Sequence, residues 1–231
     1  FKKNYSLFLL FKQDYKKAWE IGDGRLKLQE YTLPGTWLDN FKNKIWQGEE
    51  IKSNHKVLII KEQGIGDEIL YSTMYSEALK FFPNCKIETE ERLLSLFKRS
   101  YHNENIIPIY SISNNKKKVE KFDKIIFSAS LTRFFRNSKT DFLKKTAIKI
   151  NQELCKEISN DLTILSKKKK IGIAWKSRRE FLGEGKSINI ETFLPILELN
   201  TDFDFINLQY GEIGEDLEKL NKYNIKLKSL K

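Results

Sequence analysis

The 231-residue sequence has few of the residues that usually mark disulfides, metal sites and histidine chemistry. Its two cysteines, Cys85 and Cys155, lie 70 positions apart without CxxC spacing, and its two histidines are His55 and His102. We therefore expect free thiols in a reducing compartment. Neither a zinc site nor a histidine-based triad is expected, and no metal is predicted.

Long apolar runs are also missing. The longest candidate, SLFLLF at residues 6–11, is far shorter than the ~20 residues that a membrane span needs. No secretory signal is visible, so a cytoplasmic location without a membrane span is expected. The chain begins at Phe1 rather than at a methionine, and we expect it to be a fragment of a longer protein.

Acidic residues are outnumbered, with 31 Asp and Glu against 42 Lys and Arg, for a formal charge of +11. Such an excess is compatible with a nucleic-acid partner. However, the basic runs NNKKKVEK (114–121) and SKKKK (166–170) fall at apparent loops and lack regularly interleaved aromatic residues. A solvated lysine surface with no nucleic-acid partner is the expected interpretation.

Apolar periodicity divides the chain. Spacings of three and four residues predict a helix over 1–30, which ends before Pro34 and Gly35. Short apolar runs at 56–60, 85–90, 105–110 and 122–129 then alternate with helix-like segments, which predicts an α/β fold with a Rossmann-like, doubly wound parallel sheet.

A second alternation follows later in the chain. Residues 138–165 are predicted to be mostly helical, and 166–170 to form a solvated hinge. Strands are then expected at 171–175 and 203–209, and helices at 189–199 and 214–223. We therefore predict a helical connector (1–50), a Rossmann-like domain with a linker helix (51–165), and the start of a second Rossmann-like domain (166–231).

The first predicted strand runs into the motif KVLIIKEQGIGDEIL at 56–70. Gly64 and Gly66 can take positive φ and let a backbone or a ligand approach closely. Two interpretations of Asp67 stay open: it caps the following helix, or it is a carboxylate placed to remove a proton from a hydroxyl. A dinucleotide fingerprint is weak because Ile69 occupies its third glycine position, and no P-loop pattern occurs.

EQGIGDEIL closely resembles the EQG-hydrophobic-GD motif of bacterial tetratricopeptide-repeat-linked glycosyltransferases, which are related to the heptosyltransferases and have the GT-B fold. Other segments resemble that family in the same order: YKKAWEIGDGRLK, IWQGEEIKSNHKVLIIKEQG, IETEERLLSLFKRSY, IGIAWKSRREFLGEGKSINIETFLPIL and FDFINLQYG. The resemblance implies an acceptor domain and a truncated donor domain. It departs from the family at Lys186-Ser187, where an Arg-Ser pair is more usual.

The resemblance also implies a reaction: metal-independent transfer of a sugar from a nucleotide sugar to a hydroxyl of a protein, lipid or polysaccharide, with no other cofactor. Asp67 is the implied general base, and Glu62 and Glu68 are fallbacks. Glu62 could equally brace the turn, and Glu68 could face solvent. The residues expected to bind donor phosphate are Lys176, Ser177, Arg178, Arg179, Lys186 and Ser187, although they could also form a solvated basic loop. Those expected to line the cleft are Glu62, Gln63, Gly64, Gly66, Gln209 and Gly211, although LQYG at 208–211 could be only a turn from strand to loop.

Two rival functions remain open. The chain could be a non-catalytic Rossmann-like scaffold, joined through upstream helical repeats to a protein partner. It could also be a basic nucleic-acid-binding domain. Trp175 is expected to lie in the core rather than to stack on a nucleotide base.

Overall fold

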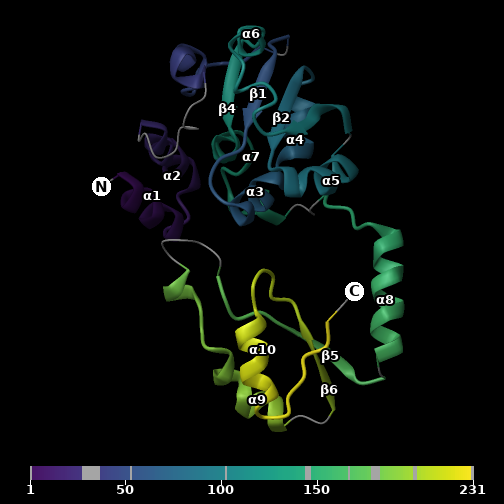
Figure 1. Cartoon of the computed structure of the whole chain (residues 1–231). Coiled ribbons are helices and arrows are strands. Elements are labelled where there is room, and N and C mark those ends of the chain that lie inside the picture. The colour runs from purple at the N-terminus through teal and green to yellow at the C-terminus, as the bar shows by residue number, and fades with distance from the viewer. Residues whose placement is uncertain are drawn as a thin grey trace. The chain divides into compact units, whose positions relative to one another are not determined.

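The computed structural model describes residues 2–27, 37–52, 54–101, 103–143, 147–165, 167–177, 183–199 and 202–229. The chain forms two compact units, residues 1–150 and 151–231 (Figure 1). The predicted linker helix, α8 (Gln152–Leu165), is grouped with the second unit.

The first unit contains a four-stranded sheet in the order β3-β2-β1-β4, and all of its strand pairs are parallel. The strands are β1 (Val57–Ile60), β2 (Cys85–Thr89), β3 (Ile106–Pro108) and β4 (Lys124–Phe127). The helices between and after them are α3 (Ile65–Ser72), α4 (Tyr75–Phe81), α5 (Glu91–Ser100), α6 (Lys116–Val119) and α7 (Thr132–Phe135). The predicted α/β fold with a parallel sheet is confirmed.

Alternate residues of the central strand serve two cores. Val57 and Ile59 pack with residues of α4 and α5 on one face of the sheet. Leu58 and Ile60 pack on the other face, against residues of α6 and of the 3-10 helix η3 (Trp37–Lys44). All four side chains are buried, as expected for the central strand of a sheet that is covered on both faces.

The segment before the sheet differs from the prediction of a single helix over 1–30. It forms α1 (Lys2–Phe11), α2 (Tyr15–Gly22) and the 3-10 helix η1 (Asp23–Lys27). The break occurs at Gln13, whose φ is 61°. The turn folds α2 back against α1, where the Ser6 hydroxyl donates a hydrogen bond to the Ala18 carbonyl oxygen. Apolar periodicity does not reveal this break because the three- and four-residue spacing of apolar residues continues across it.

The second unit contains a parallel pair of strands, β5 (Lys169–Ile173) and β6 (Phe203–Asn207). Around them lie α9 (Leu194–Leu199), α10 (Gly214–Asn221) and the short 3-10 helices η7 (Glu184–Lys186) and η8 (Ile190–Phe193). Trp175 is buried in their core, as predicted.

Residues 138–165 are mostly helical, as predicted, but in two pieces: the 3-10 helix η6 (Lys139–Leu143) and α8 (Gln152–Leu165), with non-helical residues 147–151 before α8. One prediction near the start of the second unit is wrong. The predicted hinge at 166–170 is partly strand, because β5 begins at Lys169 and Lys170 pairs with the buried Asp204 at 3.5 Å.

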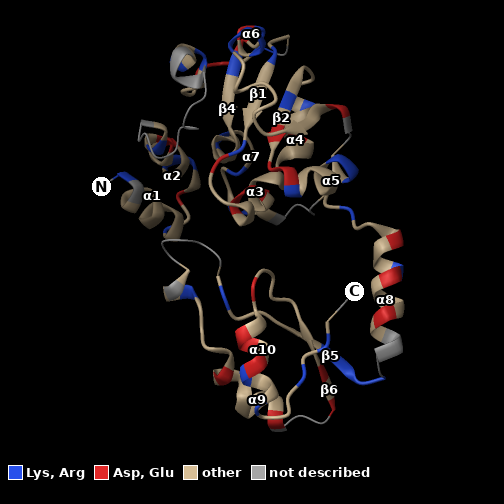
Figure 2. Cartoon of the chain, viewed as in Figure 1, with Lys and Arg blue, Asp and Glu red and all other residues tan. Residues whose placement is uncertain are grey.

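Basic residues are spread over both units (Figure 2). Several of them are paired in the structure, including Arg25, Arg136 and Lys176. In the described part of the chain, no helix combines the length and the apolar character that crossing a membrane requires.

Candidate functional site

The topology of the first sheet marks one place where a ligand is expected. The connection from β1 leads to β2 on one side, whereas β4 pairs with β1 on the other side. The loops that leave β1 and β4 therefore diverge at neighbouring carboxyl ends. In open α/β sheets, ligands bind at such a switch point. The motif EQGIGD begins two residues after β1.

Neither glycine of this motif takes the positive φ that glycine permits. Gly64 is extended, with φ −87° and ψ 174°, and it precedes the first turn of α3. Gly66 lies inside that turn. The left-handed residue is Gln63, with φ 63°. A residue with a side chain in this conformation carries local strain, which is concentrated at functional sites in proteins.

Asp67 acts as a helix cap. Its Oδ2 accepts a hydrogen bond from the Gly64 N–H at 3.1 Å. Among the described residues, the other carboxylate oxygen accepts no hydrogen bond, and the side chain is half-buried. The cap interpretation is therefore observed, and it leaves one oxygen for the role of a base.

Glu62 braces the loop. Its carboxylate is almost fully buried and accepts two hydrogen bonds from Arg25, both of 2.7 Å, and one from the Ala129 N–H at 2.8 Å. Arg25 also donates to Asp23 and to Ser130. Burial alone would lower the pKa of Arg25, but the hydrogen bonds and charge of Glu62, together with Asp23, raise it above its ordinary value. This network joins η1 to the loops after β1 and β4.

Glu68 does not face solvent, contrary to the alternative that its sequence position allowed. It is fully buried, and one oxygen accepts hydrogen bonds from the Thr89 hydroxyl and the Glu90 N–H. These partners lie at the end of β2 and just before α5. Burial raises the pKa of Glu68 above its ordinary value.

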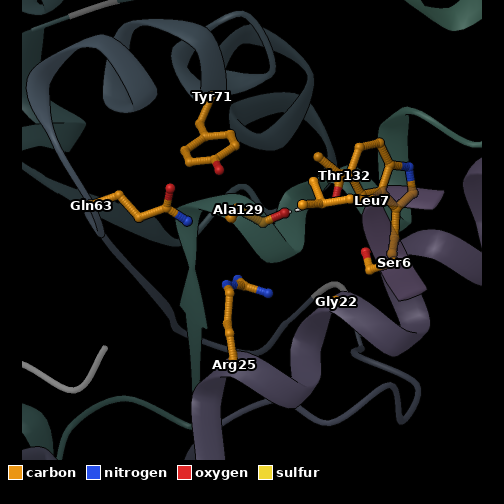
Figure 3. Close-up of a pocket in the computed structure, with 9 residues that line it drawn as sticks. Ser6, Leu7, Gly22, Arg25, Gln63, Tyr71, Ala129 and Thr132 are labelled. Atoms are coloured by element: carbon orange, nitrogen blue, oxygen red, sulfur yellow. Dashed lines mark hydrogen bonds between the residues drawn. The ribbon is translucent and has the colours of Figure 1, made fainter. Parts of the chain in front are cut away.

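A pocket of about 220 Å³ opens beside the motif (Figure 3). Its lining combines the loops after β1 and β4, helix α3 and the N-terminal helices: Ser6, Leu7, Trp19, Gly22, Arg25, Gln63, Tyr71, Ala129 and Thr132. In Figure 3 the side chains of Gln63 and Tyr71 approach one another. Burial and the charge of Glu62 raise the pKa of Tyr71 to about 12, so its hydroxyl is neutral near pH 7.

The second unit brings three of the predicted phosphate-binding residues together. Lys176, Ser177 and Lys186 line an open hollow of about 260 Å³ that follows β5. Ser187 lies beside it, where its hydroxyl donates to the Gly183 carbonyl oxygen and accepts the Ser177 N–H. Arg178 and Arg179 lie outside the described residues.

Lys176 already has an anionic partner. Its ammonium group is 2.6 Å from the buried carboxylate of Asp216, which also accepts the Trp175 indole N–H. Burial acts to raise the pKa of Asp216, but the hydrogen bonds from Lys176 and Trp175 and the charge of Lys176 lower it. A phosphate at this hollow would therefore share Lys176 with Asp216.

Gln209 is hydrogen-bonded to the backbone of the loop that follows β5. It is buried, and its Oε1 accepts the backbone N–H groups of Trp175 and Lys176. It acts on this loop as a brace. Gly211 is exposed and has φ 88°, so the turn after β6 uses the conformational freedom of glycine.

Protein FlbA of Caulobacter vibrioides is similar to this chain. The two are 24% identical over 186 residues, which covers 74% of this chain and 31% of FlbA. The chain thus spans about a third of that relative's length. No family model matches the chain, and no solved structure matches it.

The pocket differs from the sequence-based prediction mainly because residues of the N-terminal helices form part of its lining. The motif at 56–70 predicted where the loop lies, and Gln63 does line the pocket. The sequence does not predict that Ser6, Trp19 and Arg25 line the pocket. Nothing local in the sequence signals that Arg25 pairs with Glu62, because the contact joins residues 37 positions apart.

Proposed function

We propose that this chain is part of a metal-independent glycosyltransferase of the GT-B type. In this proposal the first unit binds the acceptor, and the second unit contributes to binding the nucleotide-sugar donor. The proposal rests on the resemblance of EQGIGDEIL and the segments around it to repeat-linked glycosyltransferases. The relation to heptosyltransferases, the bacterial origin and the link to tetratricopeptide repeats belong to the same proposal.

The position of Asp67 is the observation that carries it. Asp67 lies in the first turn of α3, just beyond the carboxyl end of the central strand, where ligands bind in sheets of this kind. One of its oxygens is used in the cap, and the other accepts no hydrogen bond among the described residues. A carboxylate within reach of an acceptor hydroxyl is suited to remove its proton.

The reaction would be a single displacement. The acceptor oxygen forms a bond to the anomeric carbon while its proton passes to Asp67. The bond between the anomeric carbon and the phosphate oxygen breaks, and the electron pair leaves with the nucleoside diphosphate. Lys176 and Lys186 would stabilise the negative charge on that leaving group.

The test uses the full-length protein and a panel of nucleotide sugars, and it measures both donor binding and released nucleoside diphosphate. In Asp67→Asn the asparagine oxygen can still accept the Gly64 N–H, so the helix start should be retained. We expect turnover to fall by a factor of roughly 10²–10⁴, as for the loss of a general base, while donor binding is unchanged.

Asp141→Asn is the matched control. Asp141 also caps a turn through its carboxylate, accepting the N–H groups of Asn137 and Ser138, and it does not line the pocket. Its substitution should leave turnover unchanged. Full turnover in Asp67→Asn would exclude Asp67 as the base. A folded wild type that binds and cleaves none of the donors would favour the scaffold function.

A further inference from the structure

Hydrogen bonds between the segments that line the pocket stabilise its walls. The Arg25–Glu62 pair fastens η1 to the loop after β1. The Trp19 indole N–H donates to the Arg136 carbonyl oxygen at 2.6 Å and fastens α2 to the end of α7. The walls of the pocket are therefore fixed by hydrogen bonds between segments that are far apart in the sequence.

Two hydroxyl groups of the lining are arranged as acceptors. Ser6 donates its hydroxyl proton to the Ala18 carbonyl oxygen, and Thr132 donates its proton to the Ala129 carbonyl oxygen. Each hydroxyl then has only lone pairs left for a ligand. Gln63 adds an amide, with one acceptor and two donors, which also shares a hydrogen bond with the Tyr71 hydroxyl. A ligand that brings several hydroxyl groups fits this arrangement.

The charges around the pocket cancel. Arg25 lines it, but four hydrogen bonds join its guanidinium to Glu62, Asp23 and Ser130. Arg133 pairs with the other oxygen of Asp23 at 3.0 Å. Two carboxylates thus balance two guanidinium groups, and a ligand with a net charge gains little here.

Carbon surface completes the lining. Because the Trp19 N–H is already used, the indole presents only its carbon atoms, and Leu7 and Ala129 add aliphatic surface. Pockets that combine apolar walls with a few placed polar groups bind small molecules. A pyranose ring matches both the polar groups and the apolar walls, since its hydroxyl groups lie at the rim and its C–H groups form apolar faces.

We propose that this pocket binds the ring of a neutral sugar, whose hydroxyl groups donate to Ser6, Thr132 and Gln63 and whose C–H face packs against Trp19. The inference does not depend on glycosyl transfer, because a non-catalytic carbohydrate-binding protein would use the same pocket. Binding is therefore measured directly rather than through turnover.

The experiment applies ligand-observed saturation-transfer NMR to the full-length protein, with methyl pyranosides of glucose, galactose, mannose and N-acetylglucosamine. Methyl glucuronide is the charged counterpart of methyl glucoside. Nucleotide sugars form a separate arm, which distinguishes the sugar of an acceptor from that of a donor. We expect at least one neutral glycoside to bind and the glucuronide to bind at least tenfold more weakly than methyl glucoside.

Gln63→Gly removes the amide and relaxes the left-handed backbone, so it should preserve the fold. Gln13→Gly is its matched control, because Gln13 has the same residue type and nearly the same φ, 61° against 63°, and does not line the pocket. Neutral glycoside binding should fall at least tenfold in Gln63→Gly and stay unchanged in Gln13→Gly. The proposal is overturned if no neutral glycoside binds, if both variants bind alike, or if only the nucleotide-sugar arm binds.

Discussion

The buried pair between Arg25 and Glu62 allows the sharpest prediction about stability. Glu62 has 1% of its side chain exposed and Arg25 has 13%. Arg25→Met retains much of the volume of the arginine stem but leaves a buried carboxylate without its cation. We predict a loss of about 3 kcal/mol in the free energy of unfolding of the first unit, since breaking a buried pair from one side typically costs ~3–5 kcal/mol.

The lower end of this range follows from the other contacts of Glu62. The Ala129 N–H still donates to it at 2.8 Å in the variant and compensates part of the charge. Arg25→Met combined with Glu62→Gln removes both charges and retains an acceptor for Ala129. The double variant should therefore recover stability, with a coupling of roughly 2 kcal/mol between the two sites.

Native-state hydrogen exchange on peptides from β1 and β4 measures this unit separately from the rest of the protein. A loss of about 3 kcal/mol corresponds to roughly 150-fold faster exchange of the best-protected amides. The control is Arg92→Met, because Arg92 is 68% exposed and 3.7 Å from Glu90, and an exposed pair contributes ~0–1 kcal/mol. If Arg25→Met costs no more than Arg92→Met, the buried network does not hold the N-terminal segment in place.

Three further predictions concern single positions. Gly66→Ala should stabilise the protein by up to ~1 kcal/mol, because an added Cβ meets no atom within 4 Å and alanine favours helix; a lower melting temperature would contradict this. The raised pKa of Glu68 means that its stabilising contribution is present below the unfolded value of 4.5 and is lost as pH rises through the folded pKa. Glu68→Gln should therefore gain stability over the wild type between pH 4 and pH 7 in urea titrations, and a constant difference would exclude an effect of Glu68 ionisation. Gly211→Ala should cost about 1–2 kcal/mol because φ is 88°, whereas Gly214→Ala, with no atom near its added Cβ, should cost little; equal melting temperatures would refute the difference.

The strands could be predicted from the sequence because their apolar runs are continuous. Val57–Ile60 lies within the predicted 56–60, and the predicted run at 85–90 contains β2. Strands that are buried on both faces appear in the sequence as continuous apolar runs, and the polar segments between them mark where each strand ends. The break at Gln13 leaves no such pattern, since glutamine neither favours a left-handed turn nor ends a helix by itself.

The site was less predictable because it is made of distant pairs. Trp19 and Arg136 are 117 positions apart, and Arg25 and Ser130 are 105 apart. Glu68 shows the same difficulty at short range. It follows Asp67 in a polar stretch, and its burial depends on the Thr89 hydroxyl and the Glu90 N–H at the end of the next strand. Neither residue spacing nor charge reveals which neighbouring carboxylate is buried.

At two positions of the motif EQGIGD, 63 and 66, the residue present is not the one that stability alone would favour. Position 63 has positive φ, where glycine costs least, yet it carries glutamine. Position 66 lies in a helix with open space around it, where alanine is more stable, yet it carries glycine. Both choices lower stability, and both lie at the carboxyl end of β1. Local rules are typically broken in this way at functional sites, and Gln63 lines the pocket beside this loop.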